Sequence, residues 1–154
     1  MLLKIYRFFI SLLPIAYMVI IWLQSSHFNP NSIGNILTMV NSSIILVIGT
    51  LLELAHLIEF GILYFFIVVV FLCYGSLNKR KEFIAIIISV LYGLTDEIHQ
   101  IFVPFRSFSL IDLLKDSIGV LAIWFLIHKI YYAGNDTRFS LFLKGISAAF
   151  NSKK

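Results

Sequence analysis

The chain has 154 residues, of which 60% are hydrophobic and 13% are charged, and its mean hydropathy is +0.95. Soluble domains carry roughly 25% charged residues. This composition therefore leaves too little polar surface for a water-soluble globule and predicts a single-domain integral membrane protein. The net charge of +4 does not indicate nucleic-acid binding, because the basic residues are placed as in membrane proteins. Cys73 is the only cysteine, which excludes an intrachain disulfide.

Four apolar stretches have the length of a transmembrane helix, since a bilayer core of about 30 Å needs about 20 helical residues. They are residues 5–24, 52–74, 83–103 and 110–131. Pro14 lies in the first stretch, and membrane helices tolerate it. A cleaved signal peptide is the alternative for this stretch, although its apolar core is long and the QSSHFNP that follows is a poor cleavage site. Short later connections favour antiparallel neighbours, so we predict a four-transmembrane-helix antiparallel bundle.

The basic residues predict the orientation of this bundle. Lys4 and Arg7 lie at the start of the first stretch, and no Lys or Arg occurs between residues 8 and 78. Three basic residues lie between the second and third stretches, Lys129 lies at the end of the fourth, and four more follow it. The positive-inside rule therefore places the N-terminus, the middle linker and the C-terminus in the cytoplasm of a multi-pass protein of the cell membrane.

Two further segments have the periodicity of an amphipathic helix. Residues 32–42 repeat apolar side chains at helical spacing and predict a segment lying on the outer membrane surface. Residues 137–150 repeat the pattern with Arg138 and Lys144 added, which suits the anionic inner leaflet. We thus divide the chain into a transmembrane domain, 1–132, and a cytoplasmic basic amphipathic tail, 133–154. The alternative for both segments is a loosely helical or disordered linker.

Acidic residues gather at one level of the predicted bundle. At 1.5 Å per residue, Asp96 lies about 20 Å above the start of the third stretch, near the outer face. The second and fourth stretches begin outside, so Glu59 and Asp112 lie at a similar depth. Asp96 and Gln100 are four residues apart, as are Asp112 and Asp116, so each pair shares one helix face. We therefore predict a functional polar cluster on the outer side, formed by His56, Glu59, Asp96, Glu97, Gln100, Arg106, Ser109, Asp112 and Asp116.

The membrane imposes a cost on these charges. An ionisable group near the bilayer centre costs about 2.5–3.5 kcal/mol on insertion scales. The acids must therefore be protonated, hydrated or paired. We expect Lys115 to pair with Asp112 or Asp116, and Arg106 to fold onto Glu97, Asp96 or Asp112. A polar network that only holds the four helices together is the structural alternative.

The same residues carry a resemblance to a known family. HLIEF at residues 56–60 and DEIHQIFVPFRSFSLIDLLKDSIG at residues 96–119 resemble the VanZ-like family of small bacterial membrane proteins. The family pattern falls on His56, Glu59, Asp96, Glu97, Gln100, Pro104, Arg106, Ser109, Asp112 and Gly119, and WLQSS at residues 22–26 is similar as well. The chain departs from the pattern at three positions, where the family commonly has Lys, Gly and Asn and this chain has Glu53, Phe105 and Asp116.

The resemblance implies a membrane protein whose namesake is associated with resistance to teicoplanin-type glycopeptides. One hypothesis is a protein that binds an envelope lipid headgroup, a cell-wall precursor or a glycopeptide at the polar cluster, with Arg106 meeting phosphate or carboxylate. The alternative is an intramembrane enzyme acting on a lipid-linked substrate, with His56 or His99 as base and Glu97 or Asp112 as acid or metal ligand. Proton-coupled transport is a third possibility. No motif assigns catalytic residues, a resident metal or a cofactor.

Overall fold

The computed structural model describes residues 2–27, 42–134 and 137–151. Within these ranges the chain forms five α-helices and no strand, which confirms the all-α prediction for the described residues. The helices are α1 (Leu2–His27), α3 (Ser42–Cys73), α4 (Lys79–Gln100), α5 (Leu110–Tyr132) and α6 (Arg138–Asn151). The predicted interfacial segment 32–42 lies outside these ranges except for Ser42, which begins α3.

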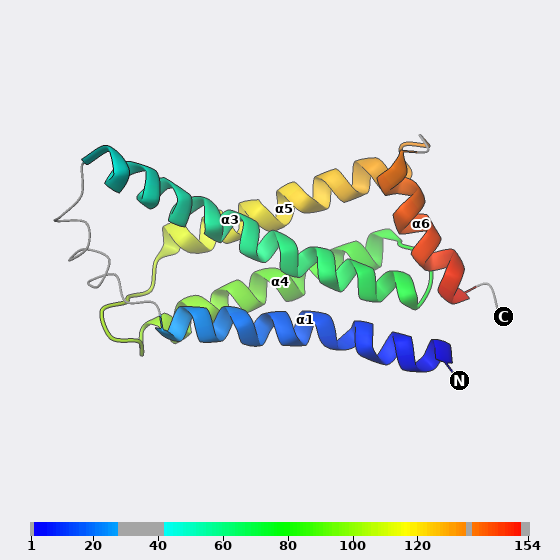
Figure 1. The fold of residues 1–154 in the computed structure, drawn as a ribbon, viewed down its shortest axis with the longest axis horizontal. Helices are drawn as coiled ribbons and strands as arrows, with labels where there is room; N and C mark the ends of the chain where they lie inside the picture. The colour runs from blue at the N-terminus through cyan, green and yellow to red at the C-terminus, as the bar shows by residue number, and fades with distance from the viewer. Residues whose placement is uncertain (1, 28–41, 135–136, 152–154) are drawn as a thin grey trace.

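The four long helices lie roughly along one axis and alternate in direction along the chain (Figure 1). α1 and α4 run towards one end of the molecule, and α3 and α5 run back. α3 contacts each of the other helices, α1, α4, α5 and α6. This is the antiparallel arrangement expected from the short connections, and it brings the end of α4 and the start of α5 to the same end of the bundle.

Local sequence explains where α4 and α5 begin. Asn78 precedes α4 in an extended conformation, and its side-chain oxygen accepts a hydrogen bond from the backbone N–H of Lys81 at 2.9 Å. Ser109 does the same for α5, accepting from the backbone N–H of Asp112 at 3.1 Å. Such caps satisfy N–H groups that have no partner inside the helix. α4 ends at Gln100, three residues before the predicted end, because a series of tight turns precedes Pro104.

The core is centred on large side chains of α3, which are joined by Ile21 of α1, Val120 and Ile127 of α5 and Leu143 of α6, and which face small or polar side chains of α4. α3 buries Phe60, Leu63, Tyr64, Ile67, Val68 and Leu72, which recur at helical spacing. The buried face of α4 holds Glu82, Ala85, Ser89, Gly93, Asp96, Glu97 and Gln100, without one large apolar residue. A polar stripe thus runs along the inner face of α4, and it ends in the predicted polar cluster.

α3 and α5 touch through their backbones. A Cβ built on Gly119 would lie 1.8 Å from the carbonyl oxygen of Leu57, and one on Gly61 would lie 2.7 Å from Cγ1 of Ile123. No side chain fits at Gly119, so this glycine allows the close approach of the two helices. Gly93 differs, because a Cβ there would meet Asp116 and Phe60 at 3.5 Å, an ordinary contact distance.

The C-terminal helix is present as predicted and packs against α3 and α5. Leu143 and Ser140 are buried in this contact. Arg7 of α1 donates through Nη2 to the carbonyl oxygen of Phe150 at 2.6 Å, and Asn151 donates to the carbonyl oxygen of Leu72 at 3.3 Å. The sequence predicted the helix but not these contacts, which hold α6 to the end of the bundle where α1 begins.

One helix among the described residues, α1, is long and apolar enough to cross a membrane by length and composition. Residues Leu57–Cys73 of α3 form a shorter apolar helical segment. The other predicted membrane helices, α4 and α5, carry charged residues within their length.

Candidate functional site

α4 ends and α5 begins at the same end of the bundle (Figure 1), and most residues of the predicted polar cluster lie at this end. Asp96, Glu97 and Gln100 lie on the last turns of α4, and they are 3%, 0% and 1% exposed. The amide Nε2 of Gln100 donates to Oδ2 of Asp96 at 2.9 Å. The four-residue spacing of this pair places both side chains on the same helix face, as the sequence predicted.

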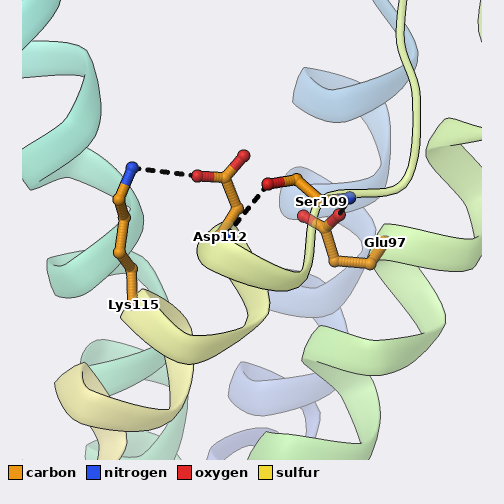
Figure 2. A network of polar contacts seen from close by, with 4 residues as sticks. All are labelled: Glu97, Ser109, Asp112 and Lys115. Atoms are coloured by element: carbon orange, nitrogen blue, oxygen red, sulfur yellow. Dashed lines mark hydrogen bonds and ion pairs between the residues drawn. The ribbon is translucent and has the colours of Figure 1, made fainter.

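Glu97 ties α4 to the start of α5. Its Oε2 accepts a hydrogen bond from the backbone N–H of Ser109 at 2.8 Å (Figure 2). This N–H belongs to the residue that caps α5, so one carboxylate holds the end of the connecting loop against α4. Among the described residues, Oε1 of Glu97 and Oδ1 of Asp96 are buried and accept no hydrogen bond. A buried acceptor without a donor costs roughly 1–3 kcal/mol.

Ser109, Asp112 and Lys115 form a chain of contacts on the first turns of α5. Oγ of Ser109 accepts from the backbone N–H of Asp112, and Nζ of Lys115 lies 3.0 Å from Oδ1 of Asp112 (Figure 2). The expected pairing of Lys115 with Asp112 is therefore confirmed. The two side chains are 21% and 27% exposed. This ion pair thus lies at the accessible edge of the cluster, whereas Asp96 and Glu97 lie beneath it.

Asp116 is buried one turn further along α5 and faces the backbone of α4. Its Oδ2 lies 3.5 Å from the position that a Cβ on Gly93 would take. The close crossing of α3 and α5 at Gly119, three residues later, fixes the rotation that directs Asp116 towards α4. The structure therefore brings Asp116 to the inner face of α4, next to the helix turn that carries Asp96.

Arg106 lies in the loop between α4 and α5 and is half-buried. Its backbone N–H donates to the carbonyl oxygen of Val103 at 3.1 Å, which closes a turn around Pro104. Phe105 has a φ of 64°, in the left-handed region that favours glycine. This backbone conformation gives a physical reason for the glycine that VanZ-like proteins commonly have at this position. Whether Arg106 folds onto Glu97, Asp96 or Asp112 remains a prediction.

α3 contributes two residues to the predicted cluster, His56 and Glu59, and the structure describes the side chain of Glu59 alone. His56 lies in α3, but its side chain is outside the described atoms. Glu59 is half-buried on the same helix and makes an interaction of its own. Both residues flank Leu57, whose carbonyl oxygen touches Gly119 of α5. They therefore lie on the part of α3 that crosses α5 near Asp116.

His99 is a member of this end of the bundle that the predicted cluster left out. Its ring stacks on Trp22 of α1, with centroids 3.6 Å apart and planes 22° apart. Its Nε2 lies 2.8 Å from Oγ of Ser26. Trp22 and Ser26 belong to the WLQSS stretch that resembles the family. This contact was not predicted from the sequence, and that resemblance is the one signal that could have indicated it. α1 thus joins the site through His99.

A second polar contact occurs at the opposite end of the bundle and was not predicted. Oε2 of Glu82, which is buried at the start of α4, lies 3.0 Å from Nδ1 of His128 near the end of α5. His128 also contacts the rings of Trp124 and Tyr132. Glu82 was hidden from sequence reasoning because it follows three basic residues and was assigned to the solvated linker.

Two groups of side chains can be distinguished at the predicted site. Asp96, Glu97 and Asp116 are buried and form an acidic floor. Arg106, Asp112, Lys115 and His99 are half-buried and form an accessible rim that contains two permanent cations. Within the described ranges, no group of three or more His, Cys, Asp or Glu side chains is arranged to hold a metal ion. The rim can bind an anion through charge-assisted hydrogen bonds, while the floor can accept hydrogen bonds from hydroxyl groups.

These features define a helical bundle with a cluster of buried and half-buried polar residues at one end. The model of one family, described as VanZ/LLP1, matches residues 3–132. The chain belongs to this family, which confirms the resemblance seen in the sequence. No curated protein and no solved structure matches the chain.

Proposed function

We propose that this VanZ/LLP1 protein crosses the cell membrane four times, with both termini in the cytoplasm. The surface of the described helices supports membrane burial. Phe8, Phe9, Val19 and Ile20 of α1 are all more than half exposed. At 1.5 Å per residue, α4 and α5, with 22 and 23 residues, are about 33 and 35 Å long, enough for a bilayer core of about 30 Å.

The charges and aromatic residues are distributed as a membrane requires. In α4 the charged residues lie in the first and last turns, and in α5 they lie in the first two turns and at Lys129. Exposed tyrosines, Tyr6, Tyr74 and Tyr132, belong to the helix ends opposite the polar cluster, whereas Trp22 lies beside the cluster. Aromatic residues of this kind concentrate at the two membrane interfaces. The middle of α4 and of α5 is left for the hydrocarbon region.

The polar cluster, in this proposal, faces outward and binds the headgroup of an envelope lipid or of a lipid-linked cell-wall precursor. The observation that carries the proposal is the bond from the Ser109 N–H to Glu97, which holds the loop bearing Arg106 against the buried acids. A guanidinium has five donors, so Arg106 can contact a protein carboxylate and a ligand phosphate together. Capture or shielding of a precursor at this site would give resistance to teicoplanin-type glycopeptides.

The experiment compares Arg106→Ala with Arg80→Ala. Arg80 is exposed in the first turn of α4 at the other end of the bundle, so it is a matched charge control. Each variant is expressed in a deletion strain, purified in a mild detergent and examined by mass spectrometry for copurified anionic lipids and precursors. Arg106→Ala should lose the copurified anionic species and any glycopeptide resistance, with its thermal stability retained. Equal lipid content and equal resistance in the two variants would contradict the headgroup proposal.

One contact favours the enzymatic alternative. The 2.8 Å distance between Oγ of Ser26 and Nε2 of His99 is within the range for a nucleophile and its base. Oγ of Ser26 also lies 2.7 Å from the carbonyl oxygen of Trp22, which supplies a competing acceptor for the hydroxyl proton. If this pair cleaves a lipid-linked substrate, the cleavage products should be present with the unchanged protein and absent with the Ser26→Ala variant. An unchanged lipid profile in that variant would exclude nucleophilic catalysis by Ser26.

A further inference from the structure

An apolar groove lies between α1 and α4, beside the polar cluster. Five residues line it: Ile15, Met18, Val19 and Trp22 from α1, and Tyr92 from α4. Its volume is about 270 Å³. Pockets that enclose a whole small-molecule ligand usually measure roughly 300–1,000 Å³. The groove is therefore of a size to take one chain of an amphiphile and not the entire molecule.

The apolar lining of the groove favours a hydrocarbon occupant. The single hydroxyl among the lining side chains, that of Tyr92, already donates to the carbonyl oxygen of Met18 at 2.5 Å. The remaining lining side chains offer aliphatic, thioether and indole surface. Ile15 and Val19 are 56% and 52% exposed, so the groove opens on the face of α1 that meets lipid in the proposed membrane placement.

The groove ends at the polar cluster. Trp22 lines one end of it and stacks on His99, whose Nε2 contacts Ser26. From Ile15 to Trp22 the helix rises about 10 Å. Two contacts, Tyr92 with Met18 and His99 with Trp22, hold α1 and α4 together along this length. A chain in the groove would therefore have its polar end at His99, at the accessible edge of the cluster.

We propose that this groove holds one acyl or isoprenyl chain of an anionic amphiphile from the outer leaflet, whose headgroup lies at the polar cluster. This inference rests on the proposed headgroup function and names the class of its ligand, a lipid with a chain long enough to enter the groove. The favoured occupant is lipid because the groove is continuous with the exposed apolar face of α1. It also ends at His99, a member of the same rim as Arg106 and Lys115, and these two cations complement an anionic headgroup.

The test uses the fluorescence of Trp22. The chain has two tryptophans, so Trp124→Phe leaves Trp22 as the only one. This protein is reconstituted in phosphatidylcholine vesicles with a fixed fraction of phosphatidylglycerol or phosphatidylcholine brominated on the acyl chain. Emission is normalised to unbrominated vesicles. The same measurement is made after adding Val19→Phe, which fills the groove, or Ile20→Phe, which adds the same ring to a neighbouring residue that is 54% exposed and outside the groove.

The expected result is that brominated phosphatidylglycerol quenches Trp22 more than brominated phosphatidylcholine, and that the relative affinity calculated from the quenching is about threefold higher for phosphatidylglycerol, the effect of about one net hydrogen bond. Val19→Phe should abolish the excess, and Ile20→Phe should retain it. If the two variants behave alike, the groove inference is overturned, and a remaining phosphatidylglycerol preference still supports headgroup binding. A third outcome is that the two brominated lipids quench Trp22 equally before Val19→Phe is added, and that Val19→Phe lowers both equally. Chain binding is then supported, and the anionic headgroup proposal fails. A change in oligomeric mass with Val19→Phe alone would instead assign the groove to contact with a second copy.

Discussion

The close crossing of α3 and α5 at Gly119 predicts that replacing this glycine with alanine destabilises the protein. A Cβ at this position would lie 1.8 Å from the carbonyl oxygen of Leu57, whereas ordinary contact begins at 3.4 Å. Gly119→Ala therefore requires the two helix backbones to move apart by about 1.6 Å (3.4 − 1.8). The obstructing atom belongs to the backbone, so no side-chain rotation relieves the clash.

Two other glycines supply controls for this substitution. A Cβ on Gly145 of α6 has nothing within 4 Å, and one on Gly93 meets its neighbours at 3.5 Å. Replacing a helical glycine with alanine stabilises a protein by about 0.5–1 kcal/mol when space allows. Overpacking costs about 1–3 kcal/mol and occasionally more. We expect Gly145→Ala to gain about 0.5–1 kcal/mol, Gly93→Ala to change stability by less than about 1 kcal/mol, and Gly119→Ala to lose about 2–3 kcal/mol or more.

Thermal unfolding in detergent compares the three variants under identical conditions. For a chain of this size, 1 kcal/mol corresponds to a shift in Tm of about 2–4 °C. Gly119→Ala should therefore lower the Tm by roughly 5–10 °C, while Gly145→Ala should raise it slightly. Equal melting of Gly119→Ala and Gly145→Ala would show that α3 and α5 are not in backbone contact, and the position of Asp116 beside α4 would lose its support.

Three further substitutions test the loop and the start of α5, each by the same unfolding measurement. Ser109→Ala removes the helix cap and should cost about 1 kcal/mol; an unchanged Tm would refute the capping role. Phe105→Gly relieves a left-handed backbone and should stabilise the protein by about 1 kcal/mol; a lower Tm would show that the exposed Phe105 ring contributes more than the strain. Glu97→Gln keeps an acceptor for the Ser109 N–H, whereas Glu97→Ala removes it, so the alanine variant should be the less stable by about 1–3 kcal/mol; the reverse order would remove Glu97 from the loop anchor.

Much of the helical framework could be predicted from the sequence, because apolar runs bounded by Pro, Asn or Ser have few alternatives. α1, α4 and α5 lie within a few residues of their predicted ranges. α3 begins about ten residues earlier than predicted, at Ser42, because the bilayer thickness limited the predicted length and the apolar run continues beyond it. Within the site, helical spacing was enough to predict that Asp96 would share a face with Gln100.

The contacts that sequence reasoning missed join residues far apart in the chain. Glu82 and His128 are 46 residues apart, and Ser26 and His99 are 73 residues apart. Such pairs depend on how each helix is rotated about its axis, and a single sequence gives the face of a helix but not the partner of that face. The left-handed conformation of Phe105 was also missed, since only the departure from the family glycine hinted at it.

The central claim is that the polar cluster faces outward from the cell membrane, and cysteine labelling tests it most directly. Cys73 is buried, so Cys73→Ser gives a background without a native thiol. Ser107 and Asn78 are both exposed, in the loops at opposite ends of α4. In intact cells, an impermeant thiol reagent should label Ser107→Cys and should not label Asn78→Cys until the membrane is opened. Labelling of Asn78→Cys but not Ser107→Cys in intact cells would contradict the orientation and the outward-facing site.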